Sequence, residues 1–258
     1  MTRALATVAA LAAAGAIAGC GSASAPRHDG AAAAGGLPAP EPGGLRVGAP
    51  RALAHEAGAT TWASVRTAAA ARAGPGRMAA RVGVLRPRTP EGTTNLVPVL
   101  ARRRSGDALW VRVALPALPN GRTGWVPRAA LGAYGTSDLR LVVDRRALTA
   151  TLLRDRRVVF RAPVGIGTRS APTPAGRFLV RNVLRRYRSA FYGPIAFGTS
   201  ARSATLTDWP GGGYIGIHGT NEPGLIPGRV SHGCIRLRNH DLAALAHLLR
   251  AGTPVTIV

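Results

Sequence analysis

The stretch from Tyr214 to Arg238 reads YIGIHGTNEPGLIPGRVSHGCIRLR, two short strand patterns joined by a loop that contains two Pro-Gly pairs. Successive side chains of a strand point to opposite faces, so Ile215 and Ile217 are expected to face a core while His218 faces away from it. After the loop, the same alternation turns Cys234 away from its apolar neighbours. Two strands joined in this way are expected to present His218 and Cys234 side by side.

A thiol next to an imidazole is the minimum for nucleophilic acyl transfer. The thiolate is the attacking species, and a nearby histidine takes the proton or stabilises the ion pair. The alternative for Cys234 and His218 is a buried, unreactive cysteine beside a hydrogen-bonded histidine.

Metal binding by His218, His232, Cys234 and His240 is a second alternative. The chain has no Cys-x-x-Cys or His-Glu-x-x-His spacing, and His55-Glu56 lacks the second histidine of that motif. The spacing therefore argues against zinc, and no metal is expected.

The N-terminus has the layout of a secretory signal, because a short positive start, Met1-Thr2-Arg3, precedes an apolar run from Ala4 to Ala18. The run ends in Ile17-Ala18-Gly19-Cys20, which resembles the lipobox of bacterial lipoproteins and implies that Cys20 becomes the lipidated first residue. The alternative is an ordinary secretory signal in which Cys20 is lost or incidental. Export is expected either way, and a free thiol such as Cys234 is uncommon in an exported chain.

The residues that follow divide into a predicted tether (20–76) and a small β module (77–138). Between Ser22 and Ala59, 24 of 38 residues are Ala, Gly or Pro. Thr61 to Ala73 has the pattern of a short Ala-rich helix. The module has short strand patterns and a tight-turn signal at Asn120-Gly121, and it resembles a bacterial SH3-like module. That resemblance rests on Trp110-Val111-Arg112-Val113 and Gly124-Trp125-Val126.

From Leu139 to Val258 we predict a second domain that is mostly β. Leu139–Val143, Leu148–Leu153 and Val158–Pro163 have the pattern of a meander with short turns, and Arg177–Val183 continues it. Asp241–Arg250 is the one clear helical pattern, with Asn239 as a possible cap.

At this point the chain resembles a known family, the L,D-transpeptidase (YkuD) domain. The resemblance rests on His218-Gly219-Thr220, on Ser231-His232-Gly233-Cys234-Ile235-Arg236 and on the upstream Thr173-Pro174-Ala175-Gly176-Arg177-Phe178. It covers about Leu139 to Val258. It implies an L,D-transpeptidase-type β-sandwich or barrel with one late helix. The expected SH3-like module and disordered tether precede this domain.

The resemblance also implies roles for individual residues. Cys234 is the nucleophile, His218 is the base and the Gly219 carbonyl orients the imidazole. Ser231 and His232 shape the pocket, and the backbone N–H groups around Gly233 and Cys234 are the expected oxyanion donors. By strand alternation Arg236 lies on the Cys234 face and suits a substrate carboxylate, although it could be a solvated strand arginine. Tyr192 and Tyr214 line the cleft or are ordinary core aromatics.

The implied reaction is a two-step acyl transfer that cross-links peptidoglycan stem peptides, with carbapenems as acylating inhibitors and no cofactor. Water as acceptor would make the same site an L,D-carboxypeptidase. The expected location is the outer face of the membrane or the cell wall, with a lipid anchor at Cys20. A non-catalytic wall-binding lipoprotein is the competing hypothesis.

Composition excludes other mechanisms. All 34 basic residues are arginine, against 11 acidic residues, so the chain of 258 residues carries a formal charge of +23 and has no lysine. Without lysine there is no pyridoxal Schiff base, no phosphate-loop lysine and no Ser-x-x-Lys site. Coding bias alone could account for the diffuse charge. Nucleic-acid binding is not expected, since Arg185-Arg186-Tyr187-Arg188 is the only candidate basic stripe and export argues against it.

Overall fold

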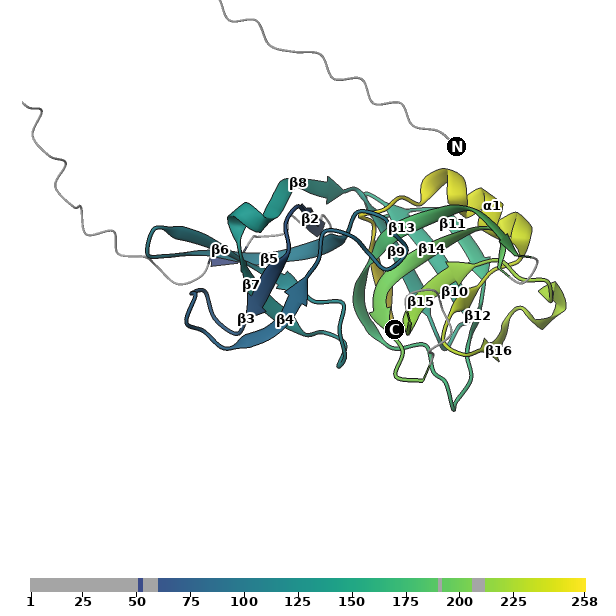
Figure 1. The fold of residues 1–258 in the computed structure, drawn as a ribbon. Coiled ribbons are helices and arrows are strands. Elements are labelled where there is room, and N and C mark those ends of the chain that lie inside the picture. The colour runs from purple at the N-terminus through teal and green to yellow at the C-terminus, as the bar shows by residue number, and fades with distance from the viewer. Residues whose placement is uncertain (1–50, 53–59, 190–191, 206–211) are drawn as a thin grey trace, which may run out of the picture. The chain divides into compact units, whose positions relative to one another are not determined.

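A computed structural model describes residues 51–52, 60–189, 192–205 and 212–258, and most of these described residues lie in two β-sheets, one on either side of residue 138 (Figure 1). The described residues contain one α-helix, α1 (Asn239–Leu248), late in the chain. The prediction of a mostly β fold with one late helix is therefore confirmed. The described residues belong to one compact unit.

The first sheet has eight strands. They are β1 (Arg51–Ala52), β2 (Thr60–Val65), β3 (Ala69–Arg72), β4 (Arg81–Leu85), β5 (Leu96–Ser105), β6 (Ala108–Ala114), β7 (Thr123–Pro127) and β8 (Leu131–Ser137). Their order is β4-β3-β7-β6-β5-β2-β8, and β1 pairs with β5. Val111 and Val113 of β6 belong to the buried core of this sheet, while Trp110 packs in a separate cluster with Trp125. A resemblance to SH3-like modules stays a prediction.

The helix predicted over 61–73 is wrong, and the tether ends earlier than residue 76. These residues form β2 and β3, and β2 pairs with both β5 and β8. Ala63 and Val65 are buried on one face of β2 with the two-residue period of a strand. Pairing with two neighbouring strands stabilises the extended conformation more than the intrinsic helix propensity of the alanines stabilises a helix.

The second sheet has ten strands. They are β9 (Leu139–Asp144), β10 (Thr149–Arg154), β11 (Arg157–Pro163), β12 (Gly165–Gly167), β13 (Gly176–Ser189), β14 (Gly193–Arg202), β15 (Tyr214–His218), β16 (Gly228–Ser231), β17 (Ile235–Arg236) and β18 (Pro254–Ile257). Their order is β11-β10-β9-β18-β13-β14-β15-β17-β12-β16. The predicted meander over β9, β10 and β11 is confirmed.

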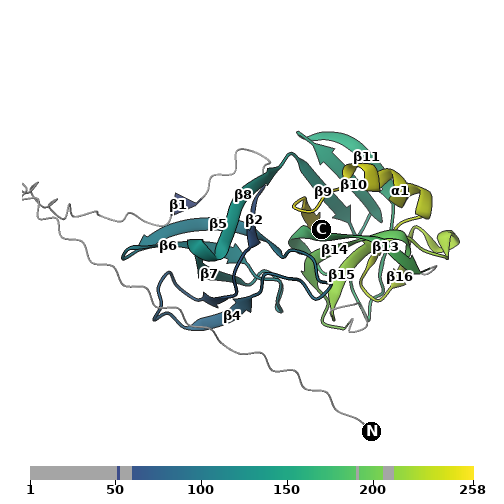
Figure 2. The ribbon, with the colours of Figure 1, turned by 45° about the horizontal axis from the view of Figure 1, so that its top comes forward.

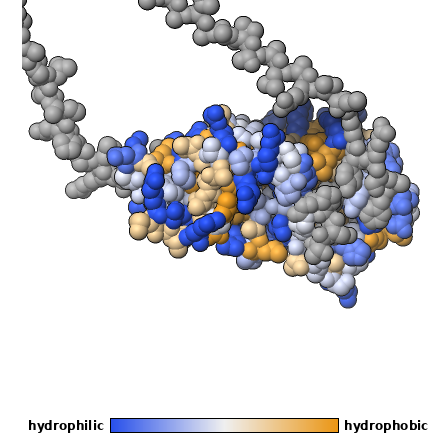
Figure 3. All heavy atoms as spheres, in the orientation of Figure 1, coloured by the Kyte–Doolittle hydropathy of each residue, from blue (hydrophilic) through white to orange (hydrophobic). Residues whose placement is uncertain are grey.

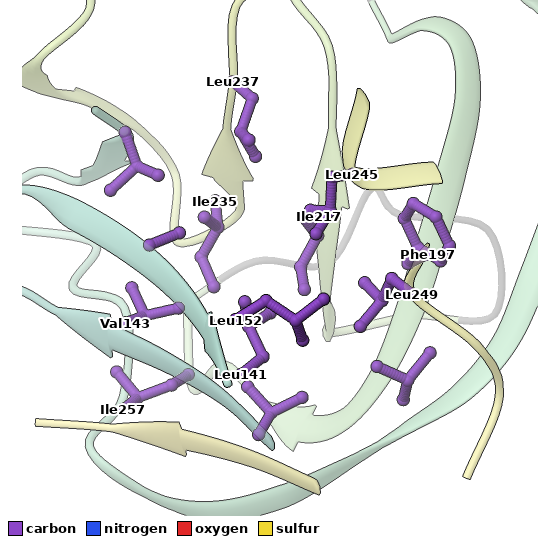
Figure 4. Close-up of a cluster of buried hydrophobic side chains, with 14 of the residues drawn as sticks. Leu141, Val143, Leu152, Phe197, Ile217, Ile235, Leu237, Leu245, Leu249 and Ile257 are labelled. Carbon is purple, nitrogen blue, oxygen red and sulfur yellow. The ribbon is translucent and has the colours of Figure 1, made fainter. Parts of the chain in front are cut away.

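The core of the second sheet is one cluster of aliphatic and aromatic side chains (Figure 4). Ile217 and Ile235 point into it from β15 and β17, as strand alternation predicts, and both are at most 1% exposed. Leu242 and Leu245 of α1 are fully buried in the same cluster, so the helix covers one face of the sheet (Figure 2). Burying the apolar faces of the sheet and the helix against one another stabilises this domain.

Several sequence predictions fall outside the described residues. These are the signal peptide over 1–19, the lipidated Cys20 and nearly all of the tether before β2. Among the residues that the structure does describe, no helix is both long enough and apolar enough to cross a membrane.

Candidate active site

Neighbouring strands bring the cysteine and the histidine together. β15 and β17 pair in parallel, with Ile217 opposite Ile235 and His218 opposite Arg236. Cys234 immediately precedes β17, and the backbone N–H of Gly216 donates a hydrogen bond of 3.3 Å to its Sγ. A donor aimed at sulfur stabilises a thiolate more than a thiol. The strand that carries His218 therefore also supplies a hydrogen-bond donor to the thiol.

His218 is held in one orientation and one tautomer. Its Nδ1 lies 2.7 Å from the carbonyl oxygen of Gly219. A carbonyl can only accept a hydrogen bond, so Nδ1 carries the proton and Nε2 keeps the lone pair. The ring of Tyr192 stands edge-on to the imidazole, with centroids 4.7 Å apart and an angle of 70° between the planes. The Gly219 carbonyl thus contacts the imidazole, and its orienting role in catalysis stays a prediction.

Burial keeps His218 neutral. The side chain is 1% exposed, and removal from water lowers its pKa from 6.5 to about 4. The bond to Gly219 opposes this shift and the charge of Arg236 adds to it. A neutral imidazole at physiological pH can accept a proton from the thiol.

Position 219 has room for glycine and no space for a β-carbon. A β-carbon there would lie 2.1 Å from Oδ1 of Asn239. The same oxygen accepts a hydrogen bond of 3.0 Å from the N–H of Thr220. The predicted cap role of Asn239 is thus wrong: it is the first residue of α1, and its side chain instead secures the turn that follows the histidine.

Ser231 fixes the turn that leads to Cys234. Its hydroxyl donates to the carbonyl of Cys234 at 2.6 Å and accepts from the N–H of Gly233 at 3.1 Å. Gly233 has a φ of 123°, a conformation that favours glycine. The Gly233 N–H donates to Ser231 in this structure, and its expected use as an oxyanion donor stays a prediction. The corresponding role of the Cys234 N–H stays a prediction.

Thr173 also stabilises the turn that leads to Cys234. Its hydroxyl donates to the carbonyl of Gly233 at 2.7 Å and accepts from the N–H of Gly167 at 2.8 Å. Thr173 is 1% exposed. The sequence analysis found this threonine only as part of a motif and assigned it no role.

Arg236 is buried rather than solvated. Its side chain is 7% exposed and lies 3.7 Å from the carboxylate of Glu222, which is 52% exposed. The alternative of a solvated strand arginine is therefore wrong. A guanidinium beside the imidazole, with a counter-ion near the surface, could bind a substrate carboxylate.

The remaining candidates differ in position. Tyr214 is 7% exposed and belongs to a small buried cluster with Ala196 and Cys234. His232 is exposed on the turn beside Cys234, so it is outside this cluster. Within the described residues, no three of the His, Cys, Asp or Glu side chains gather in a group that could hold a metal ion.

Comparison with known proteins is consistent with this arrangement. A family model described as the L,D-transpeptidase catalytic domain matches residues 138–257. YkuD of Bacillus subtilis, named as an L,D-transpeptidase, is 37% identical over 122 residues, which are 47% of this chain and 67% of that protein. The chain belongs to the L,D-transpeptidase (YkuD) family. YkuD of Bacillus licheniformis is 34% identical over the same shares of both chains.

Solved structures of L,D-transpeptidases are also similar to the chain. A crystal structure from Enterococcus faecium has 23% identity and a TM-score of 0.37 over 47% of this chain and 50% of that one. One from Mycobacterium tuberculosis has 18% identity and a TM-score of 0.40 over 64% of this chain and 90% of that one. The chain thus spans about half of the Enterococcus faecium protein. The match to the family begins one residue before the predicted start of the catalytic domain.

Proposed function

We propose that this protein is a cysteine-dependent L,D-transpeptidase that cross-links peptidoglycan through a thioester on Cys234. The observation that carries the proposal is the pairing of a buried thiol that accepts the Gly216 N–H with a neutral imidazole whose Nδ1 is fixed by Gly219. This leaves Nε2 as the basic nitrogen of His218. Membership of the L,D-transpeptidase (YkuD) family supplies the substrate class.

In the first step, Nε2 of His218 takes the thiol proton and Sγ of Cys234 attacks the carbonyl of the third residue of a tetrapeptide stem. A C–S bond forms and the C–N bond to the terminal D-alanine breaks. The imidazolium returns the proton to the departing amine. A pKa of about 4 favours the return of the proton to the departing amine and opposes its first transfer from the thiol. The Gly216 N–H assists that first transfer, because it stabilises the thiolate.

In the second step, an amine of a neighbouring stem attacks the thioester. An amide bond forms, the C–S bond breaks and the thiol of Cys234 is restored. No metal or organic cofactor takes part. If water replaces the amine, the product is a tripeptide and the enzyme is an L,D-carboxypeptidase.

Arg236 is the proposed carboxylate-binding residue for the stem peptide. Its positive charge is buried and lies close enough to His218 to lower the pKa of the imidazole. A substrate carboxylate would replace the distant contact with Glu222 by a shorter, charge-assisted one. The ring of Tyr192 against His218 would form a wall of the same pocket.

Intact-mass analysis with a carbapenem tests the proposal. A Cys20→Ala chain leaves Cys234 as the one thiol of the protein, since the sequence has two cysteines. The expected result is one covalent adduct per chain, absent in the Cys20→Ala/Cys234→Ala control. A folded Cys20→Ala protein that forms no adduct would refute the proposal.

We also propose that the protein is a lipoprotein, anchored through Cys20 on the outer face of the membrane. The lipobox-like residues before Cys20 support this location. Replacing Cys20 with Ala should move the protein from the membrane fraction to the soluble fraction. Unchanged membrane retention would argue against lipidation at this residue.

A further inference from the structure

Tyr214 is a buried ring enclosed by two arginines. The guanidinium carbon of Arg181 lies 3.7 Å from the centroid of the ring, and that of Arg202 lies 4.3 Å from it. A guanidinium over an aromatic face is attracted by the ring's negative charge density. Tyr214 is therefore held between two planar cations at the start of β15.

Tyr214, Arg181 and Arg202 each form a hydrogen bond with a residue from a loop of the first sheet. Glu91, in the loop between β4 and β5, accepts two hydrogen bonds of 2.7 and 2.8 Å from Arg181. Asn120 pairs with the backbone of Arg202 through bonds of 2.7 and 2.9 Å. The hydroxyl of Tyr214 donates to the carbonyl of Pro116 at 3.4 Å. Two loops of the first sheet, the β4–β5 loop with Glu91 and the β6–β7 loop with Pro116 and Asn120, thus converge on Tyr214 and its two arginines.

Glu91 is the critical contact of these three. The side chains of Arg181 and Glu91 are 1% and 4% exposed, so the pair is cut off from water. A buried guanidinium without its counter-ion is strongly unfavourable. Asn182 donates to the same carboxylate at 3.1 Å and to Thr93 at 3.1 Å, which fixes the position of Glu91.

A cavity offers Arg181 an alternative position. It has a volume of about 590 Å³ and is lined by Arg181, Tyr214 and parts of the first sheet, including residues 83–90 and 115–117. If Glu91 lost its charge, the guanidinium could leave the ring and move toward this space. The Glu91 carboxylate is thus what keeps Arg181 over Tyr214.

Tyr214 connects this group to the thiol. It shares one face of β15 with Gly216, whose N–H donates to Sγ of Cys234, and with His218. Gly216 is two residues along the strand, a distance of about 7 Å. Tyr214 and Cys234 also belong to one buried cluster with Ala196. A displacement of Tyr214 would therefore disturb the strand and the packing that place the sulfur.

We propose that Glu91 is a positioning residue for Cys234, acting through Arg181 and Tyr214. The first sheet is then part of the catalytic apparatus rather than a separate wall-binding module. The proposal deepens the function proposed above and rests on it for the acylation reaction. It concerns the placement of the thiol, which can also be measured without that reaction.

The test compares variants in the Cys20→Ala chain at a temperature well below the Tm of each. Glu91→Gln should slow acylation of Cys234 by a carbapenem at least tenfold, since the neutral amide lacks the charge that balances Arg181 and keeps only one of the two acceptor oxygens. A double variant, Glu91→Met with Arg181→Met, removes both buried charges and should recover the Tm while acylation stays slow. Asp138→Asn is the matched control, because it breaks the exposed pair of Asp138 with Arg154. Asp138→Asn should leave the acylation rate within twofold of that of the Cys20→Ala parent.

Two results would overturn the proposal. One is an acylation rate for Glu91→Gln within threefold of the parent. The other is a double variant that regains the parent rate together with its Tm, which would make the role merely structural. If Glu91→Gln does not fold, the double variant alone decides between these outcomes.

A second readout separates this proposal from the proposed function. The alkylation rate of Cys234 by iodoacetamide should change at least threefold in both Glu91 variants, because the surroundings of the thiol change. If the parent forms no carbapenem adduct, the proposed function fails, and alkylation still tests the positioning role. Alkylation rates equal to that of the parent in both variants would refute it.

Discussion

At the scale of single residues, the burial of His218 has two consequences. It removes the imidazole from water and so favours the neutral base that proton transfer from Cys234 requires. It also makes the folded state sensitive to acid, because the unfolded chain binds a proton at a pH where the folded protein does not.

The pH dependence of stability should reflect this difference. The pKa of His218 falls from 6.5 to about 4 on folding, so the unfolded state binds more protons between these values and stability rises with pH across this range. Between pH 7 and pH 5 the free energy of unfolding should fall by about 2 kcal/mol on account of His218. Urea denaturation at both pH values measures the loss.

The His218→Gln variant is the control for this prediction. It lacks the titrating group, so its loss of stability between pH 7 and pH 5 should be smaller by that amount. An equal loss in both proteins would mean that other groups account for the acid sensitivity.

Thr173→Val should weaken the turn before Cys234. The substitution keeps the shape of the side chain but leaves the carbonyl of Gly233 and the N–H of Gly167 buried without their partner. The expected cost is about 3 kcal/mol of unfolding free energy, with slower acylation of Cys234. Thr136→Val, at an exposed position of β8, should change neither quantity, and a Thr173→Val protein as stable as the parent would contradict the account of this turn.

At the scale of elements, strand alternation predicted which residues face the core. Ile215 and Ile217, like Ile235 after the loop, belong to the core cluster of the second sheet, whereas Tyr214 belongs to a separate cluster with Cys234. The pattern placed these two strands side by side but could not predict that β15 and β17 run parallel, because strand direction depends on the path of the loop between them. The roles of Thr173 and Glu91 were missed because their partners lie 60 and 90 residues away.

The hairpin between β10 and β11 offers a test of turn geometry. Asp155 and Arg156 have φ values of 47° and 69°, a left-handed conformation that costs a residue with a side chain about 1 kcal/mol. Arg156→Gly should therefore raise the free energy of unfolding, by up to about 1 kcal/mol. Arg157→Gly, one residue later within β11, should lower it. Denaturant melts of both variants measure the two signs, and destabilisation by Arg156→Gly would contradict the turn assignment.

At the scale of the whole molecule, the net charge of +23 is spread rather than concentrated. Figure 3 shows hydrophilic side chains scattered among apolar ones on the face that it presents. Such a surface favours non-specific attraction to anionic polymers and lipids more than it defines a site. The arginines that matter for the proposed chemistry are instead buried ones, Arg181 and Arg236.

The two sheets should depend on each other for stability. A fragment of residues 138–258 matches the extent of the family domain but leaves Arg181 without Glu91. Loss of one partner of a buried ion pair costs about 3–5 kcal/mol, so the fragment should unfold at a lower temperature than the full chain. Calorimetry of both proteins measures the difference, and an equal Tm would contradict this dependence.

The most direct test of the central claim is turnover of a disaccharide-tetrapeptide by the Cys20→Ala chain, followed by mass spectrometry. We predict a cross-linked dimer, release of one D-alanine for each bond formed, and loss of both products in the additional Cys234→Ala variant. D-alanine release without a dimer would indicate the carboxypeptidase reaction at the same thiol. The absence of D-alanine release by a folded protein with an acceptor amine present, or release that persists without Cys234, would contradict the account.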